Sequence, residues 1–332
     1  MGNFNGDENT LGMFYESGNY ANPTGTTLTW IGQVQNHTPN EDMGTKPTRN
    51  LGTNNRAVDM FVDGPQDVNG TFTYYPQDWK MLAFAFGTNV DAGSPSPYSH
   101  TMSETRSSAG NAMTSGNVFP SFTLEDSKYY NPTGLNFIRT IKGCIINNYS
   151  LNATQGGIVE CNVDYIGQSC TYTSGAVSAI TAATTRPFLW SDILLSIPSG
   201  TGIAPLKNIT FSMANNTYAP HYLNGSRVIG TPQQLNLDYS LNATLDMTSE
   251  LAKTFYDSYF QGGSTFNALL TLVDTAYGGI GSRGLIVTMS GCKLMDIDIP
   301  SPMEGVNEYT LTIQPQNCSA LVNDDIFKYN AW

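Results

Sequence analysis

The chain has 332 residues, a formal net charge of −12 at pH 7 and only 13% charged residues, about half the usual charged share of a soluble protein. The acidic balance argues against nucleic-acid binding through a basic patch. No apolar run approaches the ~18 residues of a membrane-spanning helix, and the N-terminus shows no signal-peptide pattern, so we expect a soluble protein made in the host cytoplasm.

The first half of the chain begins with a polar segment and continues as a mostly β domain. Residues 1–25 are rich in Gly and Asn, which predicts an N-terminal arm without a core of its own. A first domain is expected over residues 26–172. Its Pro- and Gly-containing stretches 36–57 and 88–117 are expected to be loops. Residues 78–87 place apolar side chains at i, i+3, i+4 and i+7 before a glycine, which predicts a short helix.

A stretch of small residues without aromatics, 173–186, is expected to be a linker. The second domain is expected over residues 187–332. Residues 206–213 alternate as a strand does. Residues 249–260 carry an apolar stripe after a capping serine, which predicts a second short helix.

A doubled segment organises the whole sequence. Residues 138–170 and 286–318 align without a gap at an offset of 148, and eight of the aligned positions are identical, where chance would give about two. The repeat predicts two copies of one domain in tandem. The identical pairs are Ile138/Ile286, Thr140/Thr288, Gly143/Gly291, Cys144/Cys292, Gly157/Gly305, Glu160/Glu308, Gln168/Gln316 and Cys170/Cys318.

Each repeat is expected to be an antiparallel hairpin with a glycine at its turn, Gly157 in the first and Gly305 in the second. This geometry brings cysteines opposite one another, within disulfide range. The expected facing pairs are Cys144–Cys170 and Cys292–Cys318, with Cys161 left as a free thiol. Two interpretations stay open, cross-strand disulfides or reduced thiols in a cytoplasm. A zinc site is not expected, because no CxxC or nearby His occurs.

The two faces of these strands differ in polarity. Odd positions are mostly apolar and even positions mostly polar, so both copies are expected to bury the same face. The polar face is either an ordinary solvated face or the wall of a channel. The acidic side chains that would line such a channel are Glu160, Asp164, Asp296, Asp298 and Glu308.

Asn-X-Ser/Thr acceptors are frequent, but only slightly more so than this composition gives by chance, and they are weak glycosylation candidates. They are Asn36, Asn69, Asn148, Asn152, Asn208, Asn215, Asn224, Asn242 and Asn317.

The sequence offers no catalytic constellation. His37, His100 and His221 lie in loop-like stretches without metal-ligand spacing. No nucleophile elbow, P-loop or dinucleotide fingerprint occurs. Asp296 and Asp298 share a strand face but no evident cleft. We expect no enzyme, no metal and no cofactor.

Several features together resemble the major tail tube protein of tailed viruses, from phages or archaeal viruses. They are the strand–loop–strand–helix opening with Trp79 and the helix end AFAFG, the strand FPSFTLE at 119–125, and the hairpin that begins IKGC or MSGC and closes VDYIGQ or LTIQPQ. The ordered pattern extends over nearly the whole chain beyond the arm. It implies a β-sandwich or barrel-like tube domain with one flanking α-helix, duplicated in tandem.

The resemblance also implies a function. Similar proteins form rings that stack into a hollow tube around a tape-measure protein, and DNA later passes through without specific binding. A fused two-domain member implies a pseudo-sixfold ring of three chains, located in the virion tail, with tail terminator and baseplate proteins as further partners and no membrane. The N-terminal arm and residues 88–117 are candidates for ring-to-ring contacts.

Two alternatives remain. One is another viral or cell-surface coat or filament subunit, such as a double-barrel capsid protein, although each jelly roll needs eight strands and fewer are expected here. The other is a β-sandwich carbohydrate-binding module or hydrolase, which would need an aromatic platform and convergent carboxylates in one copy only.

Overall fold

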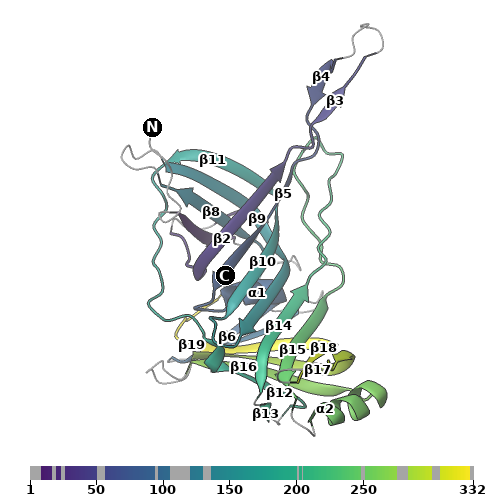
Figure 1. Cartoon of the computed structure of the whole chain (residues 1–332). Coiled ribbons are helices and arrows are strands. Elements are labelled where there is room, and N and C mark those ends of the chain that lie inside the picture. Colours follow the sequence, from purple (N-terminus) through teal and green to yellow (C-terminus); the bar gives the residue numbers. More distant parts are fainter. Residues whose placement is uncertain are drawn as a thin grey trace.

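The computed structural model describes residues 9–16, 20–23, 27–50, 57–93, 96–104, 120–129, 136–199, 202–203, 205–247, 251–274, 283–300 and 307–329. This part of the chain is mostly antiparallel β-structure, as predicted (Figure 1). The first half contains β1 (Thr10–Tyr15), β2 (Gln33–Asp42), β3 (Lys46–Thr48), β4 (Met60–Val62), β5 (Asp67–Tyr75), α1 (Lys80–Phe86), β6 (Gly87–Ala92), β7 (Tyr98–Glu104), β8 (Phe122–Lys128), β9 (Asn136–Thr154), β10 (Glu160–Gly167) and β11 (Ser169–Gly175).

The second half repeats much of this order. It contains the 3₁₀ turn η3 (Trp190–Asp192), β12 (Ile193–Ser196), β13 (Gly202–Ile203), β14 (Leu206–Ala214), β15 (Asp238–Asp246), α2 (Leu251–Thr254), the π-helical turn η4 (Phe255–Gln261), β16 (Phe266–Asp274), β17 (Arg283–Asp298), β18 (Glu308–Gln314) and β19 (Asn317–Asp324).

One continuous antiparallel sheet crosses both halves. Its strand order is β2–β5–β10–β9–β14–β15–β18–β17, and we call it the long sheet. The first four strands come from the first half and the last four from the second (Figure 1). The two halves are therefore joined edge to edge in a single sheet.

The strands β9 and β17 each bend at a glycine and so belong to two sheets. Outside the long sheet, the first part of β9 pairs with β8 and β11. The first part of β17 pairs with β16 and β19. Gly143 and Gly291 lie at the turning points with φ of 65° and 62°, a region that L side chains disfavour. Apolar side chains from these outer strands, the long sheet and α1 form one core.

Both predicted helices are confirmed. All seven residues of α1 are buried, and Gly87 ends the helix in a left-handed conformation with φ of 88°. The second helix is α-helical only in α2 and continues as the π-helical η4; the serine expected to cap it, Ser249, lies outside the described residues. Among the described helices, none has the length and apolar character needed to cross a membrane.

Several expected loops and the expected arm take part in the sheets. β2 runs through residues 36–42 in spite of Pro39, because a sheet edge tolerates proline. β6 pairs with β7, and β7 also pairs with β19 of the second half; residues 94–95 and 105–119 lie outside the described part. β1 pairs with β8 and buries Leu11 and Met13, so the arm does contribute to the core.

Candidate assembly surface

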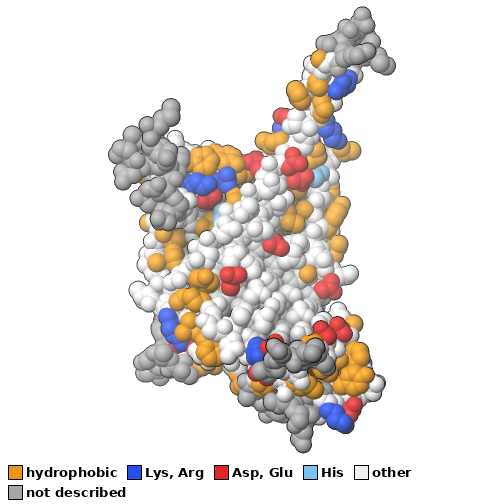
Figure 2. Space-filling view, viewed as in Figure 1, with side chains coloured by type: hydrophobic (Ala, Val, Ile, Leu, Met, Phe, Trp, Pro, Cys, Tyr) orange, Lys and Arg blue, Asp and Glu red, His pale blue; other side chains and the backbone are white. Residues whose placement is uncertain are grey.

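The exposed face of the long sheet is polar and acidic. Its strands alternate between buried and more accessible positions along their length, and the accessible positions are mostly Asn, Ser and Thr. Figure 2 shows this broad face as uncharged groups with scattered acidic side chains. A hollow of about 380 Å³ spans both halves, with Asp164 and Thr312 among its lining residues.

The five predicted channel-lining carboxylates all lie on this sheet, at positions of the accessible parity; they are Glu160 and Asp164 on β10, Asp296 and Asp298 on β17, and Glu308 on β18. Asp164 accepts a hydrogen bond from Asn148 Nδ2 at 3.0 Å. Glu308 and Asp246 both bind Lys207 Nζ, at 2.6 and 2.7 Å. Hydrogen bonds to Asp246 and Glu308 raise the Lys207 pKa.

The seam between the halves is the antiparallel pairing of β9 with β14. Seven residue pairs run from Thr154–Asn208 to Asn148–Ala214. The seam ends at Asn215, which is fully buried and donates from Nδ2 to the carbonyls of Ile146, at 2.9 Å, and Ala85, at 3.1 Å. A buried polar group with its hydrogen bonds made is costly to separate, so the seam is a fixed junction.

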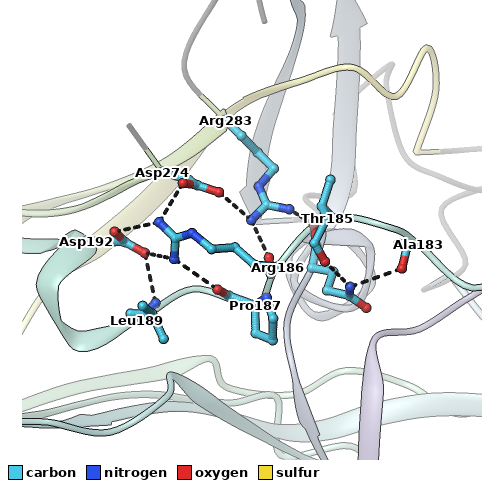
Figure 3. Close-up of polar contacts among 9 residues, drawn as sticks. Ala183, Thr185, Arg186, Pro187, Leu189, Asp192, Asp274 and Arg283 are labelled. Atoms are coloured by element: carbon cyan, nitrogen blue, oxygen red, sulfur yellow. Dashed lines mark hydrogen bonds and ion pairs between the residues drawn. The ribbon is translucent and has the colours of Figure 1, made fainter. Parts of the chain in front are cut away.

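A cluster of arginines and aspartates holds the linker against both halves (Figure 3). Arg186 binds Asp192 through two nitrogens at 2.7 and 3.0 Å and Asp274 at 2.6 Å. Arg283 binds Asp274 at 2.9 Å and donates to the Gln77 carbonyl of the first half at 3.1 Å. The Gln77 side chain in turn donates to linker carbonyls, including that of Ala183. This cluster fixes the end of the expected linker, so residues 183–186 are not a free tether.

The two ends of the long sheet are open edges. Within the described residues, β2 pairs only with β5, and the second part of β17, from Lys293 to Asp298, pairs only with β18. Open edges offer unpaired backbone donors and acceptors to another strand. They are therefore the natural places for another chain to join.

A hairpin of β3 and β4 projects away from the body of the molecule (Figure 1). It exposes apolar side chains, with Met60 at 57% and Phe61 at 71% of their accessible surface. Arg227 from the matching loop of the second half braces its base, through Asp63 at 3.2 Å and the Gly64 carbonyl at 2.9 Å. Sequence reasoning placed this segment partly in a loop; the apolar run Met60–Val62 was the available signal.

The predicted facing of the cysteines is wrong. Cys170 lies opposite Ile141 and Cys144 opposite Phe122, while Cys318 lies opposite Met289 and Cys292 opposite Phe266. The expected register fails because the first hairpin turns at residues 155–156 rather than at Gly157, so that Glu160 pairs with Asn152, and the bulge at Asn147 shifts the pairing by one more residue. The second copy has the matching bulge at Met295, and the expected turn residue Gly305 lies outside the described residues. All five cysteines, Cys161 included, are free thiols. Burial raises the pKa of Cys161 to about 12 and that of Cys292 to about 11.

The histidines have structural partners that the sequence did not reveal. His100 is buried between Asp91, at 2.6 Å, and Asp324, at 3.0 Å, and stacks on Tyr329. Burial by itself lowers the pKa of His100, but hydrogen bonds to the two carboxylates outweigh it and raise the pKa to about 9. His37 contacts the Tyr165 hydroxyl at 2.8 Å and His221 contacts Asp67. No metal-ligating group of three occurs among the described residues.

The candidate glycosylation sites fall into two groups. The Asn215 side chain is buried and engaged at the seam, which leaves no room for a glycan in the folded chain. The strands of the long sheet carry Asn36, Asn69, Asn148, Asn152, Asn208 and Asn242, and exposed positions outside it carry Asn224 and Asn317.

Comparison with known protein families identifies a family for this chain. A family model described as phage tail tube protein matches residues 20–279. Among solved structures, the chain is similar to the tail tube of SPP1, with 11% sequence identity and a TM-score of 0.31 over 43% of this chain and 82% of that one. No curated protein matches the chain.

Proposed function

The chain belongs to the phage tail tube protein family, and we propose that three copies of it close one pseudo-sixfold ring of a viral tail tube. Membership of this family makes the chain a structural component of the virion tail. The ring, its lumen and its stacking follow from the long sheet, and the observation that carries them is the seam between β9 and β14.

Strand order supports two copies of one domain. β2–β5–β10–β9 in the first half corresponds to β14–β15–β18–β17 in the second. The register shifts correspond as well. The bulge at Asn147 on β9 has its counterpart at Met295 on β17, at the offset of 148 found in the sequence. Bulges are specific features of a fold, so their coincidence favours duplication.

The internal seam is a template for a junction between chains. At the seam, β9 of the first half pairs with β14 of the second half. The counterpart of β9 in the second half is β17, and the counterpart of β14 in the first half is β2. Joining β17 of one chain to β2 of the next would repeat the seam with the same rotation, as a heterologous interface does when it closes a ring. Three chains would then form one closed barrel with no open edge.

The polar face of the long sheet is proposed to line the lumen, because its other face packs on the core. DNA carries a dense negative charge. A lining of neutral amides and hydroxyls with scattered carboxylates, among them Asp164 and Glu160, discourages adhesion. The DNA would pass without specific binding.

Stacking of rings is proposed to use the projecting hairpin. The hairpin, with exposed Met60 and Phe61, lies at one end of the molecule. The segment η4, with exposed Tyr256 and Phe260, lies at the opposite end (Figure 1). Apolar patches at opposite ends make a head-to-tail contact that repeats without closing. The earlier candidates for this contact, residues 1–25 and 88–117, are largely engaged within the chain or lie outside the described residues.

Negative-stain electron microscopy of the purified full chain, with mass measurement of the particles, tests this proposal. Hollow rings of three chains or tubes of such rings are expected. A variant with residues 46–62 replaced by a short Gly-Ser turn is expected to form rings that do not stack, which separates the two contacts. Closed shells would overturn the proposal in favour of a capsid-type subunit, and rings of six chains would overturn the fused pseudo-sixfold arrangement.

A further inference from the structure

The two edge strands of the long sheet correspond residue by residue to the two strands of the seam: β2 corresponds to β14, and β17 to β9. Val34 on β2 corresponds to Leu206 on β14, and each is followed by a register shift against the neighbouring strand. At the other end of these strands Asp42 corresponds to Ala214. On the facing strands, Asn148 of β9 corresponds to Asp296 of β17.

These correspondences fix the register of the junction between chains. Ala214 faces Asn148 in the internal seam and Ser212 faces Ser150. The matching pairs between chains are Asp42 with Asp296 and Asn40 with Asp298. We infer that ring closure sets Asp42 of one chain against Asp296 of the next, so that like charge opposes assembly until salt screens it. The inference rests on the proposed ring.

The internal seam contains no such opposition. Its accessible face pairs Asn148, Ser150 and Asn152 with Ala214, Ser212 and Thr210, all of them uncharged. Like charges placed directly opposite on neighbouring strands destabilise the pairing. The two junctions therefore share a geometry but differ in charge.

The surroundings of Asp42 add to the negative charge. Asp42 lies opposite Asp67 on β5, and both are exposed. Among the basic groups described on adjoining elements, Lys46 is exposed on β3 and His221 lies against Asp67 itself, at 2.9 Å, whereas Lys293 and Arg227 bind other groups. Lys293 on β17 donates to the Gly263 carbonyl, and Arg227 binds Asp63 at 3.2 Å.

Only part of the junction between chains can be traced in the described residues. Seven residue pairs join β9 to β14. The described strand residues of the new junction run from Asp42–Asp296 to Asn40–Asp298, beyond which Pro39 and Pro300 lack amide donors.

The expected effect is measurable. Two unit charges about 5 Å apart in water repel enough to weaken association about fourfold, or about 60-fold over three junctions of one ring. The Debye length falls from about 30 Å at 0.01 M salt to about 3 Å at 1 M. Sedimentation velocity of the full chain over a series of concentrations should show rings forming at a lower protein concentration in 1 M salt than in 0.01 M salt.

Charge variants locate the effect. Asp42→Asn should shift ring formation to lower salt, and Asp42→Lys should shift it further because it faces the carboxylate of Asp296. Asp42→Lys combined with Asp296→Lys should restore the requirement for salt. Asp164→Asn removes the same charge from the same face, away from both edges, and should leave the salt dependence unchanged.

Cysteine cross-linking tests the register itself. Asn40→Cys on one chain and Asp298→Cys on another, mixed at high salt and oxidised, should give a disulfide identified by peptide mass spectrometry. Asn36→Cys with Asp298→Cys is the out-of-register control and should give none.

The outcomes separate this inference from the proposed function. Rings that form equally at all salt concentrations in the wild type and in Asp42→Asn would overturn the charge opposition and leave the ring intact. Cross-linking in the control pair would overturn the register. Free chains under every condition, for Asp42→Lys as well, would overturn the ring and the inference with it.

Discussion

Asp274→Asn is the sharpest test of how the two halves are held in place. The Asp274 carboxylate joins two guanidinium groups, Arg186 at 2.6 Å and Arg283 at 2.9 Å, and the side chains of Asp274 and Arg283 are each only 2% exposed. The asparagine keeps the shape and can still accept a hydrogen bond, but it removes the charge. Arg283 then stays buried without the negative charge of Asp274.

The magnitude follows from burial. Removing one partner of a buried ion pair costs about 3–5 kcal/mol. The Arg186 side chain is 33% exposed, so solvent screens its share and the lower part of the range is the better expectation. For a 332-residue chain that unfolds cooperatively, the lower part of this range, about 3–4 kcal/mol, corresponds to a fall in Tm of about 4–6 °C.

Differential scanning calorimetry of the unassembled chain at low salt measures the change. Asp257→Asn is the matched control, because its partner Lys253 lies four residues away on the surface and its own side chain is 48% exposed; its Tm should change by less than about 1 °C. An Asp274→Asn protein that melts within 1 °C of the wild type would refute the reasoning, since the buried arginine would then need no carboxylate.

Three further predictions concern other parts of the chain. Hydrogen bonds to Asp91 and Asp324 raise the pKa of His100 in the folded chain to about 9 from 6.5. The stabilisation that protonated His100 gives the folded chain is therefore complete below about pH 6.5 and is lost as the pH rises through about 9. Urea unfolding should show a free energy of unfolding about 2–3 kcal/mol lower at pH 10 than at pH 7, and His100→Gln should abolish this difference. Gly143→Ala should destabilise by more than the ~1–2 kcal/mol of a left-handed residue, since its Cβ would lie 2.8 Å from the Tyr20 ring, whereas Gly156→Ala, with nothing within 4 Å, should pay only the backbone term; equal losses in denaturant titrations would contradict the crowding. Native protein should react with a thiol reagent at pH 8 through Cys170 alone, because the other four thiols are buried, and a reducing agent should leave the Tm unchanged; a Tm lowered by reduction would restore the disulfide hypothesis.

The sequence repeat and the buried and accessible faces of its strands could be predicted from the sequence. Identical residues recur at an offset of 148, and apolar and polar residues alternate with a period of two. The alternation correctly placed Tyr149 and Leu311 in the core and Glu160 and Glu308 on the accessible face. The helices at residues 80–86 and 251–261 could also be read, since each has an apolar stripe and a glycine after it.

Register and long-range partners could not be read. The first hairpin turns at residues 155–156 rather than at Gly157, and the bulge at Asn147 shifts the pairing by one more residue; no simple sequence pattern reveals either. Pro39 argued for a loop, although at a sheet edge it costs little. The partners of Arg283 come from residues 77, 186 and 274, which only the folded chain brings together.

The covalent link across the β9–β14 seam has a kinetic consequence for the proposed tube. Half of the junctions in such a ring form as the chain folds, where the effective concentration of one strand for the other is on the order of millimolar, and before any collision between molecules. A nucleus then needs three bodies to meet instead of six, so its rate depends on a lower power of protein concentration. Tails could therefore begin to grow while the subunit is still scarce.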